Sequence, residues 1–321
     1  MKAIGIILAG GNNNRMKELT AKRAVPALPV AGSFRSIDFA LSSMSNSHIQ
    51  TVAVLTQYNA RSLNEHLSSS KWWNFGRKQG GLFLFTPTVT ADNSDWYRGT
   101  ADAMYQNIDF LKRRHEPYVI ISSGDCVYKL DFNRVLDFHI EKKSDITVVC
   151  KDMMYNDDVS RFGVVRMDDE SRITEFDEKP IEASSNTIST GIYVIRRRQL
   201  IELLEAAAEE NRFDFVNDIL VRYKNVKKIY GYKINSYWNN IADIDAYFKT
   251  NMDFLRPDVR SYFFREEPTI CSKVDDLPPA KFNPGSDISN SLVSSGCIIN
   301  GSVEDLSLIH ISEPTRPLYI S

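Results

Sequence analysis

The stretch Lys2-Ala-Ile-Gly-Ile-Ile-Leu-Ala-Gly-Gly11 is a hydrophobic run that leads straight into a glycine turn. Such a run is typical of the first buried strand of an α/β sheet, and a ligand site is expected where this strand ends. Backbone N–H groups and the positive end of the following helix converge on anions there. Gly10 and Gly11 lack a Cβ and suit a close approach to phosphate, although two glycines after a strand could also be only a tight turn.

The turn continues as Asn12-Asn13-Asn14-Arg15, where a phosphate loop would contain another glycine. Asparagine visits left-handed backbone conformations more readily than most residues, but less freely than glycine. The sequence therefore predicts a turn that forms and that fits a triphosphate less well than a glycine-rich loop.

Composition limits the class of protein. With 321 residues, of which 43% are hydrophobic, we expect one large globular domain of roughly 250 residues and a smaller part. A formal net charge of -2 gives no basic face for nucleic acid. The N-terminal apolar run is too short to span a bilayer and lacks a cleavage site, so we expect neither a membrane segment nor a signal peptide, and a cytoplasmic protein.

The cysteines and histidines do not indicate a metal site. The four cysteines are far apart and show no paired ligand spacing, so we interpret them as buried thiols rather than disulfides or zinc ligands. The five histidines show no HExxH or related spacing. None of them is a good catalytic candidate.

Strands and helices alternate along the first 255 residues. We expect buried parallel strands at Ala3–Leu8, Thr51–Thr56, Tyr118–Ser122 and Asp145–Cys150, because these runs are apolar and β-branched. We expect helices at Asp38–Asn46, Thr100–Arg114, Asn133–Lys142, Arg196–Glu210 and Phe213–Tyr223, and a hairpin from Phe162–Arg166 and Ile173–Phe176. This order predicts an α/β fold with a mixed, mostly parallel sheet and ligands at the carboxyl ends of its strands.

The alternation of predicted strands and helices stops after Leu255. Prolines spread through residues 256–285 predict a linker without helices or central strands. In residues 286–305, Val293 and Ile299 are six apart, as are Cys297 and Val303, which predicts the start of a parallel β-helix that is cut short. Residues 306–321 leave this period and resemble translated sequencing-adapter read-through, so we expect a non-native tail.

Four clusters in the first domain could carry chemistry. Asp125 follows an apolar strand and could hold Mg²⁺, or it could only cap a turn. Gly99 and Thr100 precede a predicted helix and suit contacts with a base or ribose, or a simple helix start. Glu178 and Lys179 could hold a sugar phosphate, or form a solvated charged turn. The run Ser189-Thr-Gly-Ile-Tyr193 offers hydroxyls beside a flexible glycine.

In order and spacing, motifs along residues 1–305 resemble the bacterial glucose-1-phosphate adenylyltransferases, the ADP-glucose pyrophosphorylases of glycogen synthesis. The motifs are Leu8-Ala-Gly-Gly11, Leu19-Thr-Ala-Lys-Arg-Ala24, Phe34-Arg-Ser-Ile-Asp-Phe-Ala-Leu-Ser42, Thr56-Gln-Tyr58, Trp96-Tyr-Arg-Gly-Thr-Ala-Asp-Ala103, Gly124-Asp125, Glu178-Lys-Pro180, Gly191-Ile-Tyr193 and Tyr237-Trp238. The resemblance implies a nucleotidyltransferase Rossmann-like domain at residues 1–255, followed by the start of a left-handed β-helix.

The resemblance also implies a reaction and a role for each matched residue. Glucose 1-phosphate would attack the α-phosphorus of Mg-ATP in line, and pyrophosphate would leave. The implied catalytic residues are Arg15, on the triphosphate, and Asp125, on Mg²⁺. The implied nucleotide-binding residues are Leu8, Ala9, Gly10, Gly11, Gln57, Gly99 and Thr100. The implied sugar-phosphate residues are Glu178, Lys179 and Ser189, and Lys22 matches a position associated with activator binding.

Departures from the family pattern suggest a change of role. The loop has Asn13 and Asn14 in place of the family's Gly-Thr, Val25 stands in place of a lysine, and Asn240 stands in place of a metal-binding aspartate. Loss of one such contact typically costs about 10² to 10³ in rate. This pattern resembles the GlgD-type regulatory subunit, which is weakly catalytic or non-catalytic and pairs with a catalytic subunit.

Three hypotheses follow from this pattern. The first is a regulatory subunit in a hetero- or homo-tetramer, responsive to sugar phosphates or nucleotides. The second is a divergent but fully active transferase, and the third is a non-enzymatic sugar-phosphate sensor or scaffold. A dehydrogenase is excluded because no GxGxxG follows the first strand.

Overall fold

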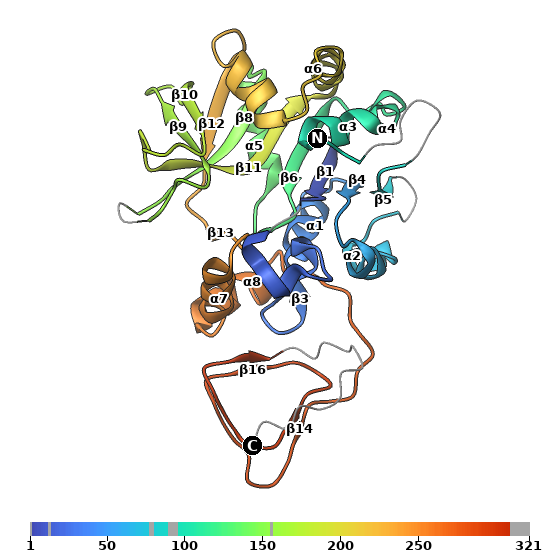
Figure 1. The fold of residues 1–321 in the computed structure, drawn as a ribbon, viewed down its shortest axis with the longest axis vertical. Coiled ribbons are helices and arrows are strands. Elements are labelled where there is room, and N and C mark those ends of the chain that lie inside the picture. Colours follow the sequence, from blue (N-terminus) through green and yellow to red (C-terminus); the bar gives the residue numbers. More distant parts are fainter. Residues whose placement is uncertain (1, 12–13, 77–79, 89–95, 155–156, 309–321) are drawn as a thin grey trace.

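A computed structural model describes residues 2–11, 14–76, 80–88, 96–154 and 157–308 of the chain. A mixed sheet with helices on both faces dominates it and confirms the predicted α/β class (Figure 1). The sheet contains β1 (Ala3–Ala9), β4 (Thr51–Thr56), β5 (Gly81–Phe85), β6 (Tyr118–Ser123), β8 (Ile146–Asp152), β9 (Gly163–Met167), β10 (Ile173–Glu178), β11 (Thr187–Arg196) and β12 (Ile229–Lys233). The main helices are α1 (Ser36–Asn46), α2 (Arg61–His66), α3 (Thr100–Gln106), α4 (Ile108–Lys112), α5 (Phe132–Glu141), α6 (Arg197–Glu209), α7 (Ile244–Asp253) and α8 (Pro257–Phe264).

Strand β1 lies at the centre of the sheet, between its parallel neighbours β4 and β6. Its side chains alternate between two cores: Ile4 and Ile6 pack with residues of α3 and α6, whereas Ala3 and Ile7 pack with residues of α1 and α5. Both faces of the strand are therefore buried. This explains why its sequence is a continuous apolar run rather than an alternating one.

Strand β11 interrupts the parallel order of the sheet, because it runs antiparallel to both of its neighbours β6 and β8. Strand β8, which we expected at Asp145–Cys150 as a parallel strand, therefore runs in the same direction as β6, and it pairs in parallel with β12. The hairpin of β9 and β10 is confirmed. A buried apolar run does not reveal strand direction, because both faces are covered in either case.

The helix expected at Thr100–Arg114 is interrupted. It forms α3 and α4, separated at Asn107, whose side-chain Nδ2 donates to the Ala103 carbonyl at 2.9 Å and to the Tyr97 hydroxyl at 2.9 Å. An amide that bonds a carbonyl four residues back competes with the helical ladder. The segment Phe213–Tyr223 also departs from an α-helix, because Val216–Val221 forms a π-helix.

The expectation that no helix forms after Leu255 is wrong. Helix α8 begins at Pro257, and Phe263 in its last turn is fully buried. Proline is well tolerated at the first position of a helix, where its missing N–H would have no partner in any case. The helix packs in a third core, formed with residues such as Phe39 and Phe254.

The C-terminal strands form two stacked turns of a β-helix-like coil, seen as the triangular part of Figure 1. The strands are β14 (Lys281–Phe282), β15 (Asp287–Ser289), β16 (Leu292–Val293), β17 (Ile298–Ile299), β18 (Ser302–Glu304) and β19 (Ser307–Leu308). They pair β14 with β17, β15 with β18 and β16 with β19, all in parallel. The coil starts at Lys281, inside the expected linker, and ends at Leu308, three residues into the segment that we expected to lack the six-residue period. Residues 309–321 lie outside the described residues.

A buried histidine gives a pH-dependent prediction. His139 Nδ1 lies 2.8 Å from Thr147 Oγ1, Nε2 has no hydrogen-bond partner among the described residues, and burial lowers the pKa of His139 to about 4, with a smaller contribution from the Arg196 charge. Between pH 4 and 6.5 the unfolded chain binds the extra proton, so this site loses stability as the pH falls through that window. We expect a loss of about 2 kcal/mol at pH 5 relative to pH 7.5.

Urea unfolding at both pH values measures this effect. The variant His139→Gln should remove most of the acid loss, whereas His115→Gln, at an exposed position, should leave it unchanged. Equal acid losses in wild type and His139→Gln would contradict the assignment.

Candidate functional site

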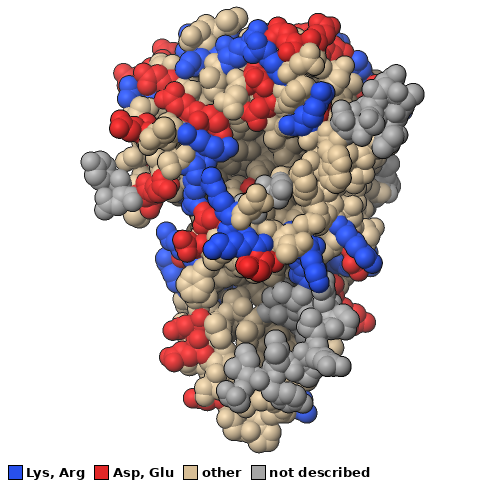
Figure 2. Space-filling view, viewed as in Figure 1, with Lys and Arg blue, Asp and Glu red and all other residues tan. Residues whose placement is uncertain are grey.

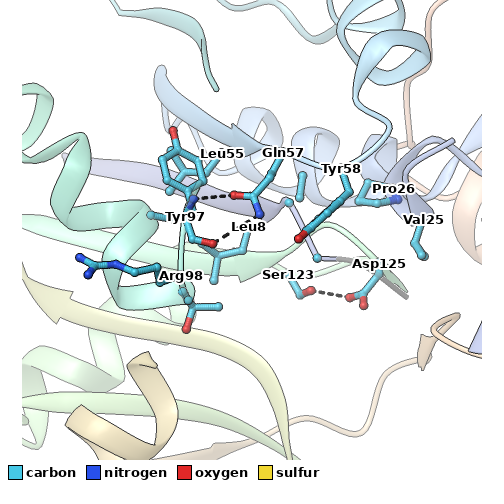
Figure 3. Close-up of a pocket in the computed structure, with 16 residues that line it drawn as sticks. Leu8, Val25, Pro26, Leu55, Gln57, Tyr58, Tyr97, Arg98, Ser123 and Asp125 are labelled. Carbon is cyan, nitrogen blue, oxygen red and sulfur yellow. Dashed lines mark hydrogen bonds between the residues drawn. The ribbon is translucent and has the colours of Figure 1, made fainter. Parts of the chain in front are cut away.

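A cavity of about 500 Å³ lies where β1, β4 and β6 end and α3 begins (Figure 3). This is the edge at which ligands are expected in an open parallel sheet. Its lining residues are Leu8, Ala9, Gly10, Gly11, Val25, Pro26, Leu55, Gln57, Tyr58, Tyr97, Arg98, Gly99, Thr100, Ala103, Ser123 and Asp125. The structure thus brings together all seven positions predicted to contact a nucleotide, and adds Asp125 to them.

The glycine turn comes close to the next strand end. A Cβ on Gly10 would lie 3.1 Å from Gln57 Cβ, whereas a Cβ on Gly11 would meet no atom within 4 Å. A side chain at position 10 would therefore crowd Gln57, whereas Gly11 leaves its backbone open toward the cavity. Asn12 and Asn13 lie outside the described residues, so the predicted loop chemistry is not placed by the structure.

Gln57 lines the cavity but uses its amide on the protein. Its Oε1 accepts from the Tyr97 N–H at 2.8 Å, and its Nε2 donates to the Tyr97 carbonyl at 3.4 Å (Figure 3). This pair of bonds fixes the segment that leads into α3 against the end of β4. We expected Gln57 to face a base; the residue lines the cavity, and its amide holds the cavity wall.

Gly99 is required by a close backbone contact. A Cβ there would lie 2.3 Å from the Phe213 carbonyl oxygen, which accepts from the N–H groups of Ala101 at 2.8 Å and Asp102 at 3.2 Å. The Thr100 hydroxyl accepts from the Phe215 N–H at 2.9 Å. Two donors at the start of α3 are thus already occupied, so this end of the helix contributes shape to the cavity more than hydrogen bonds to an anion.

Asp125 stands at the opposite end of the cavity, held by neighbouring side chains. Its Oδ1 accepts from the Ser123 hydroxyl and from Cys126 Sγ, the latter at 3.5 Å. Burial and the Asp125 charge raise the pKa of the Cys126 thiol, so the thiol stays protonated and can donate. The Asn240 side chain donates to Cys126 Sγ at 3.4 Å and accepts from the Ala242 N–H at 2.9 Å. In the part of the chain described, Asp125 Oδ2 has no hydrogen-bond partner.

The predicted sugar-phosphate residues gather on β10 and β11. Lys179 Nζ lies 3.0 Å from Glu178 Oε1, and the Ser189 hydroxyl lies 3.3 Å from the buried Tyr193 hydroxyl. Burial raises the pKa of Tyr193, the bond to Ser189 partly offsets this, and the charges of Glu178 and Asp214 raise it further. Glu178, Ser189, Tyr193 and Asp214 therefore share one neighbourhood.

This second group adjoins the cavity without lining it. Gly191 on β11 has φ +74°, and a Cβ there would lie 3.6 Å from Ser123 Cβ, at the cavity wall. Glycine is the residue that adopts this conformation without strain. The Ser189–Tyr193 stretch thus bends past the end of β6, beside Asp125.

Arg15 and Lys22 are not among the lining residues. Hydrogen bonds from Ser160 lower the pKa of Asp158 and burial lowers the pKa of Arg161, and the nearby Arg15 charge adds a smaller lowering to both. Arg161 forms an ion pair with Asp243. Lys22 is exposed. Lysine and arginine side chains border the hollow in the middle of the molecule, as Figure 2 shows.

Sequence reasoning missed several contributors to this region. Tyr193 lies in a motif quoted above but was given no role of its own, and Asp214 was not chosen because no local pattern links it to Glu178. The lining residue Tyr58 stacks on Trp96, with ring centroids 5.4 Å apart. Both belong to motifs quoted above, so exposed aromatic residues within those motifs were the available signal.

The described residues contain no cluster of three metal-ligand side chains and no candidate membrane span. No group of three or more histidine, cysteine, aspartate or glutamate side chains in the described ranges could hold a metal ion. No helix in this part of the chain is long and apolar enough to cross a membrane.

Comparisons with known proteins agree on one family. Residues 4–256 match the nucleotidyl transferase family. Curated relatives include the glucose-1-phosphate adenylyltransferase of Clostridium novyi (strain NT), 37% identical over 94% of this chain and 80% of the relative. The enzyme of the same name from Pseudothermotoga lettingae is 39% identical over 95% of this chain and 73% of the relative. The enzyme from Geobacillus stearothermophilus is 35% identical over 94% of this chain and 79% of the relative.

Proposed function

The chain belongs to the glucose-1-phosphate adenylyltransferase family of nucleotidyl transferases, and on this basis we propose that it serves ADP-glucose synthesis as a regulatory subunit of the GlgD type. The reaction of the assembly would be ATP and glucose 1-phosphate to ADP-glucose and pyrophosphate. The observation that carries the regulatory role is the Asp125 end of the cavity, which is walled by Val25 and Pro26 and has Asn240 beside it.

The retained parts support ligand binding. The Leu8–Gly11 turn, Gly99 and Thr100 line one continuous cavity, and Gln57 fixes its wall. Glu178, Lys179 and Ser189 adjoin it and offer a carboxylate, an ammonium group and a hydroxyl to a sugar phosphate. Such positioning groups bring two substrates together without forming a covalent intermediate.

The changed parts argue against efficient transfer. Val25 is buried and lines the cavity, so no ammonium group neutralises phosphate charge at that position. Asn240 presents a neutral amide, and both ends of that amide already bond to Cys126 and to the Ala242 backbone. Phosphoryl chemistry depends on neutralising the charge that develops in the transition state, so these losses lower the rate.

Magnesium would bind at Asp125 if it binds this chain. Asp125 Oδ2 is a carboxylate oxygen without a protein donor among the described residues, and Mg²⁺ is commonly held by one or two carboxylates together with substrate phosphates. The residues present therefore fit a site with one carboxylate. A bound Mg²⁺ would neutralise phosphate charge, and Ser123 and Cys126 would hold the orientation of Asp125.

The proposed partner is a catalytic subunit of the same family, within a tetramer. We retain Lys22 as a candidate contact for an activating sugar phosphate or nucleotide, because it is exposed and matches the family motif. We also retain Arg15 as a triphosphate contact in an assembled site. The proposed domains are residues 1–255 for nucleotidyl transfer and a β-helix after a linker, with the tail from 306 onward regarded as non-native.

Two alternatives make different predictions. A divergent active enzyme would turn over alone, with other cations replacing the missing lysine. A sensor or scaffold without enzymatic function would bind ligands but would not change the activity of a partner.

Pyrophosphate release from ATP, Mg²⁺ and glucose 1-phosphate tests the proposal. We expect the protein alone to be at least about 100-fold slower than the catalytic subunit of the same organism, because two charged contacts are missing. Addition of the protein to that subunit should change its rate or its response to effectors. Turnover by the protein alone that is lost in Asp125→Ala would sink the regulatory role, and an unchanged mixture would favour the scaffold.

A further inference from the structure

A second cavity, of about 550 Å³, lies between the end of α1, the start of α5, the end of β12 and α8. No described residue lines both this cavity and the one at the ends of β1, β4 and β6. Its lining contains three cationic side chains, Lys129, Arg134 and Lys233, and one carboxylate, that of Asp131. None of these four residues has a part in the proposed transfer reaction. The excess of positive charge in the lining favours an anionic ligand.

Serine side chains at the end of α1 hold the chain that carries two of these cations. Ser43 Oγ accepts from the Leu130 N–H at 3.2 Å, and Ser47 Oγ accepts from the Phe132 N–H at 2.9 Å. The carboxylate of Asp131 caps α5 and occupies a further N–H of its first turn. Because these N–H groups are already bonded, an anion in this cavity would depend on the cationic side chains and not on the helix end.

Lys129 brings a charge to the cavity without a carboxylate partner. Its Nζ donates to the carbonyl oxygens of Tyr262 and Glu266, the latter at 3.1 Å, and lies 4.2 Å from the centre of the Tyr262 ring. Burial lowers the pKa of Lys129, and the charges of Glu266 and Glu267 partly oppose this. Carbonyl groups carry no net charge, so they orient the ammonium group without neutralising it. Two of its three N–H donors are used in the described part of the chain, which leaves one for a ligand.

The other two cations are held loosely by acids. Arg134 Nε lies 3.7 Å from Asp131 Oδ2, and the arginine side chain is 79% exposed. Lys233 Nζ lies 2.9 Å from Asp152 Oδ2, and both side chains of this pair are also exposed. Exposed ion pairs contribute little to stability. A phosphate group accepts several charge-assisted hydrogen bonds at once, so it competes well with a single carboxylate for such cations.

We propose that this second cavity binds a phosphate dianion, either as the free ion or as the phosphate group of a small ester. Its three cations come from three segments of the chain, the residue before α5 begins its cap, α5 itself and β12, and they line one space. The volume falls within the range of about 300–1,000 Å³ that is usual for small-molecule sites. Tyr232 and Tyr262 add aromatic surface for the organic part of an ester. The inference does not rest on the proposed function.

Calorimetric titration of the full chain with inorganic phosphate and with glycerol 3-phosphate tests the proposal, at pH 8 and constant ionic strength. Glycerol 3-phosphate lacks the hexose ring that the first cavity is proposed to bind. We expect at least one of the two probes to bind with a Kd of about 1 mM or lower. A lower Kd for the ester would assign the cavity to a phosphate ester, and an equal or higher one would assign it to free phosphate. No heat of binding for either probe up to about 10 mM would overturn the proposal.

Two matched double variants test whether binding occurs in this cavity. Arg134→Gln/Lys233→Gln should raise the Kd at least about tenfold, because two charge-assisted hydrogen bonds are lost. Lys112→Gln/Arg113→Gln is the control: each of these residues also pairs with a carboxylate, at 2.6 and 3.8 Å, and neither lines a described cavity. The control should keep the Kd within about twofold of the wild type. Equal losses of affinity in the two double variants would show that the ligand responds only to overall charge and would overturn the proposal.

The experiment stays decisive if one variant is unstable. Lys129 is left unchanged, because its bonds to two carbonyl groups link it to α8 and to the residues that follow this helix. If the double variant unfolds, Arg134→Gln alone should raise the Kd about threefold, since this exposed guanidinium makes no hydrogen bond with a described residue in the unliganded chain. Pyrophosphate release tests the proposed function separately. A chain with or without that activity can bind phosphate here, so failure of either proposal leaves the other standing.

Discussion

Replacing Asp38 by alanine is expected to lower the free energy of unfolding by about 3–5 kcal/mol, the usual cost of removing one member of a buried polar pair. Asp38 is fully buried in α1, and its Oδ1 lies 2.7 Å from Nε2 of the buried His66. Its Oδ2 accepts from the Arg35 N–H at 2.8 Å and so caps the helix. The substitution would leave both partners without an acceptor.

The effect should spread beyond α1. The His66 and Trp73 rings pack edge to face, with centroids 5.5 Å apart, and Arg35 donates to the Ala27 carbonyl at 3.2 Å. Ala27 closes the short 3-10 helix that begins at Val25, so Asp38 also supports the wall of the cavity. Loss of this network would weaken the wall together with the fold.

Urea denaturation measures this effect as a shift of the midpoint at constant m-value. Asp137→Ala is the matched control, because Asp137 is an exposed helical aspartate that makes no hydrogen bond or ion pair with a described residue. That variant should stay within about 0.5 kcal/mol of the wild type. Equal midpoints for the two variants would show that the buried pair adds nothing.

Part of this fold follows from local sequence. The run before Gly10 is apolar at every position, and such a run forms a strand buried on both faces, with a turn at its glycines. The same logic places the predicted nucleotide residues, because turns after neighbouring parallel strands meet at one edge of a sheet. The predicted α/β class and the β9–β10 hairpin are confirmed for this reason.

Other features depend on contacts that no local pattern contains. The Gln57 amide bonds to Tyr97, 40 residues away, and Gly99 must be glycine because the Phe213 carbonyl approaches it. Helix α8 begins at a proline, which we took as a sign of irregular chain. In each case a tertiary contact or a position within an element decides the outcome, whereas the residue type alone leaves it open.

In the C-terminal coil, too, the sequence pattern predicts the kind of fold but not which strands pair. A six-residue spacing predicts a β-helix, but the strand pairs join Asp287 to Ser302 and Leu292 to Ser307, which are 15 residues apart, so one turn of the coil holds three short strands. Two-residue strands carry too little pattern to reveal their partners. Their pairing depends on the stacking of successive turns.

The double variant Val25→Lys/Asn240→Asp is expected to raise pyrophosphate release by the protein alone about 100-fold over the wild type. One phosphate-neutralising contact is typically worth about 10² to 10³ in rate, and contacts within one site are not additive. The introduced lysine would add a cation at the Asp125 end of the cavity. An aspartate at 240 could still accept from the Ala242 N–H, and it would place a second carboxylate near Asp125.

The single variants separate the effects of the two substitutions, because each should change a different measured quantity. Val25→Lys alone should act mainly on ATP affinity, because a lysine attracts phosphate with or without metal. Asn240→Asp alone should act mainly on the Mg²⁺ concentration needed for turnover, because two nearby carboxylates repel each other until a cation binds between them. Asp125→Ala in the double variant should abolish the gain, since Asp125 is the carboxylate that both changes are meant to support.

A control with the same residue changes tests whether position matters. Val226→Lys/Asn235→Asp alters two exposed residues, keeps the same net charge as the double variant and should leave pyrophosphate release unchanged. If the double variant folds and binds Mg-ATP but releases no more pyrophosphate than this control, the missing cation and carboxylate are not what limits transfer. The cause would then lie in the Asn12–Asn14 loop or in the absence of a partner. A gain confined to the double variant would show that two side chains separate this binding site from a catalytic one.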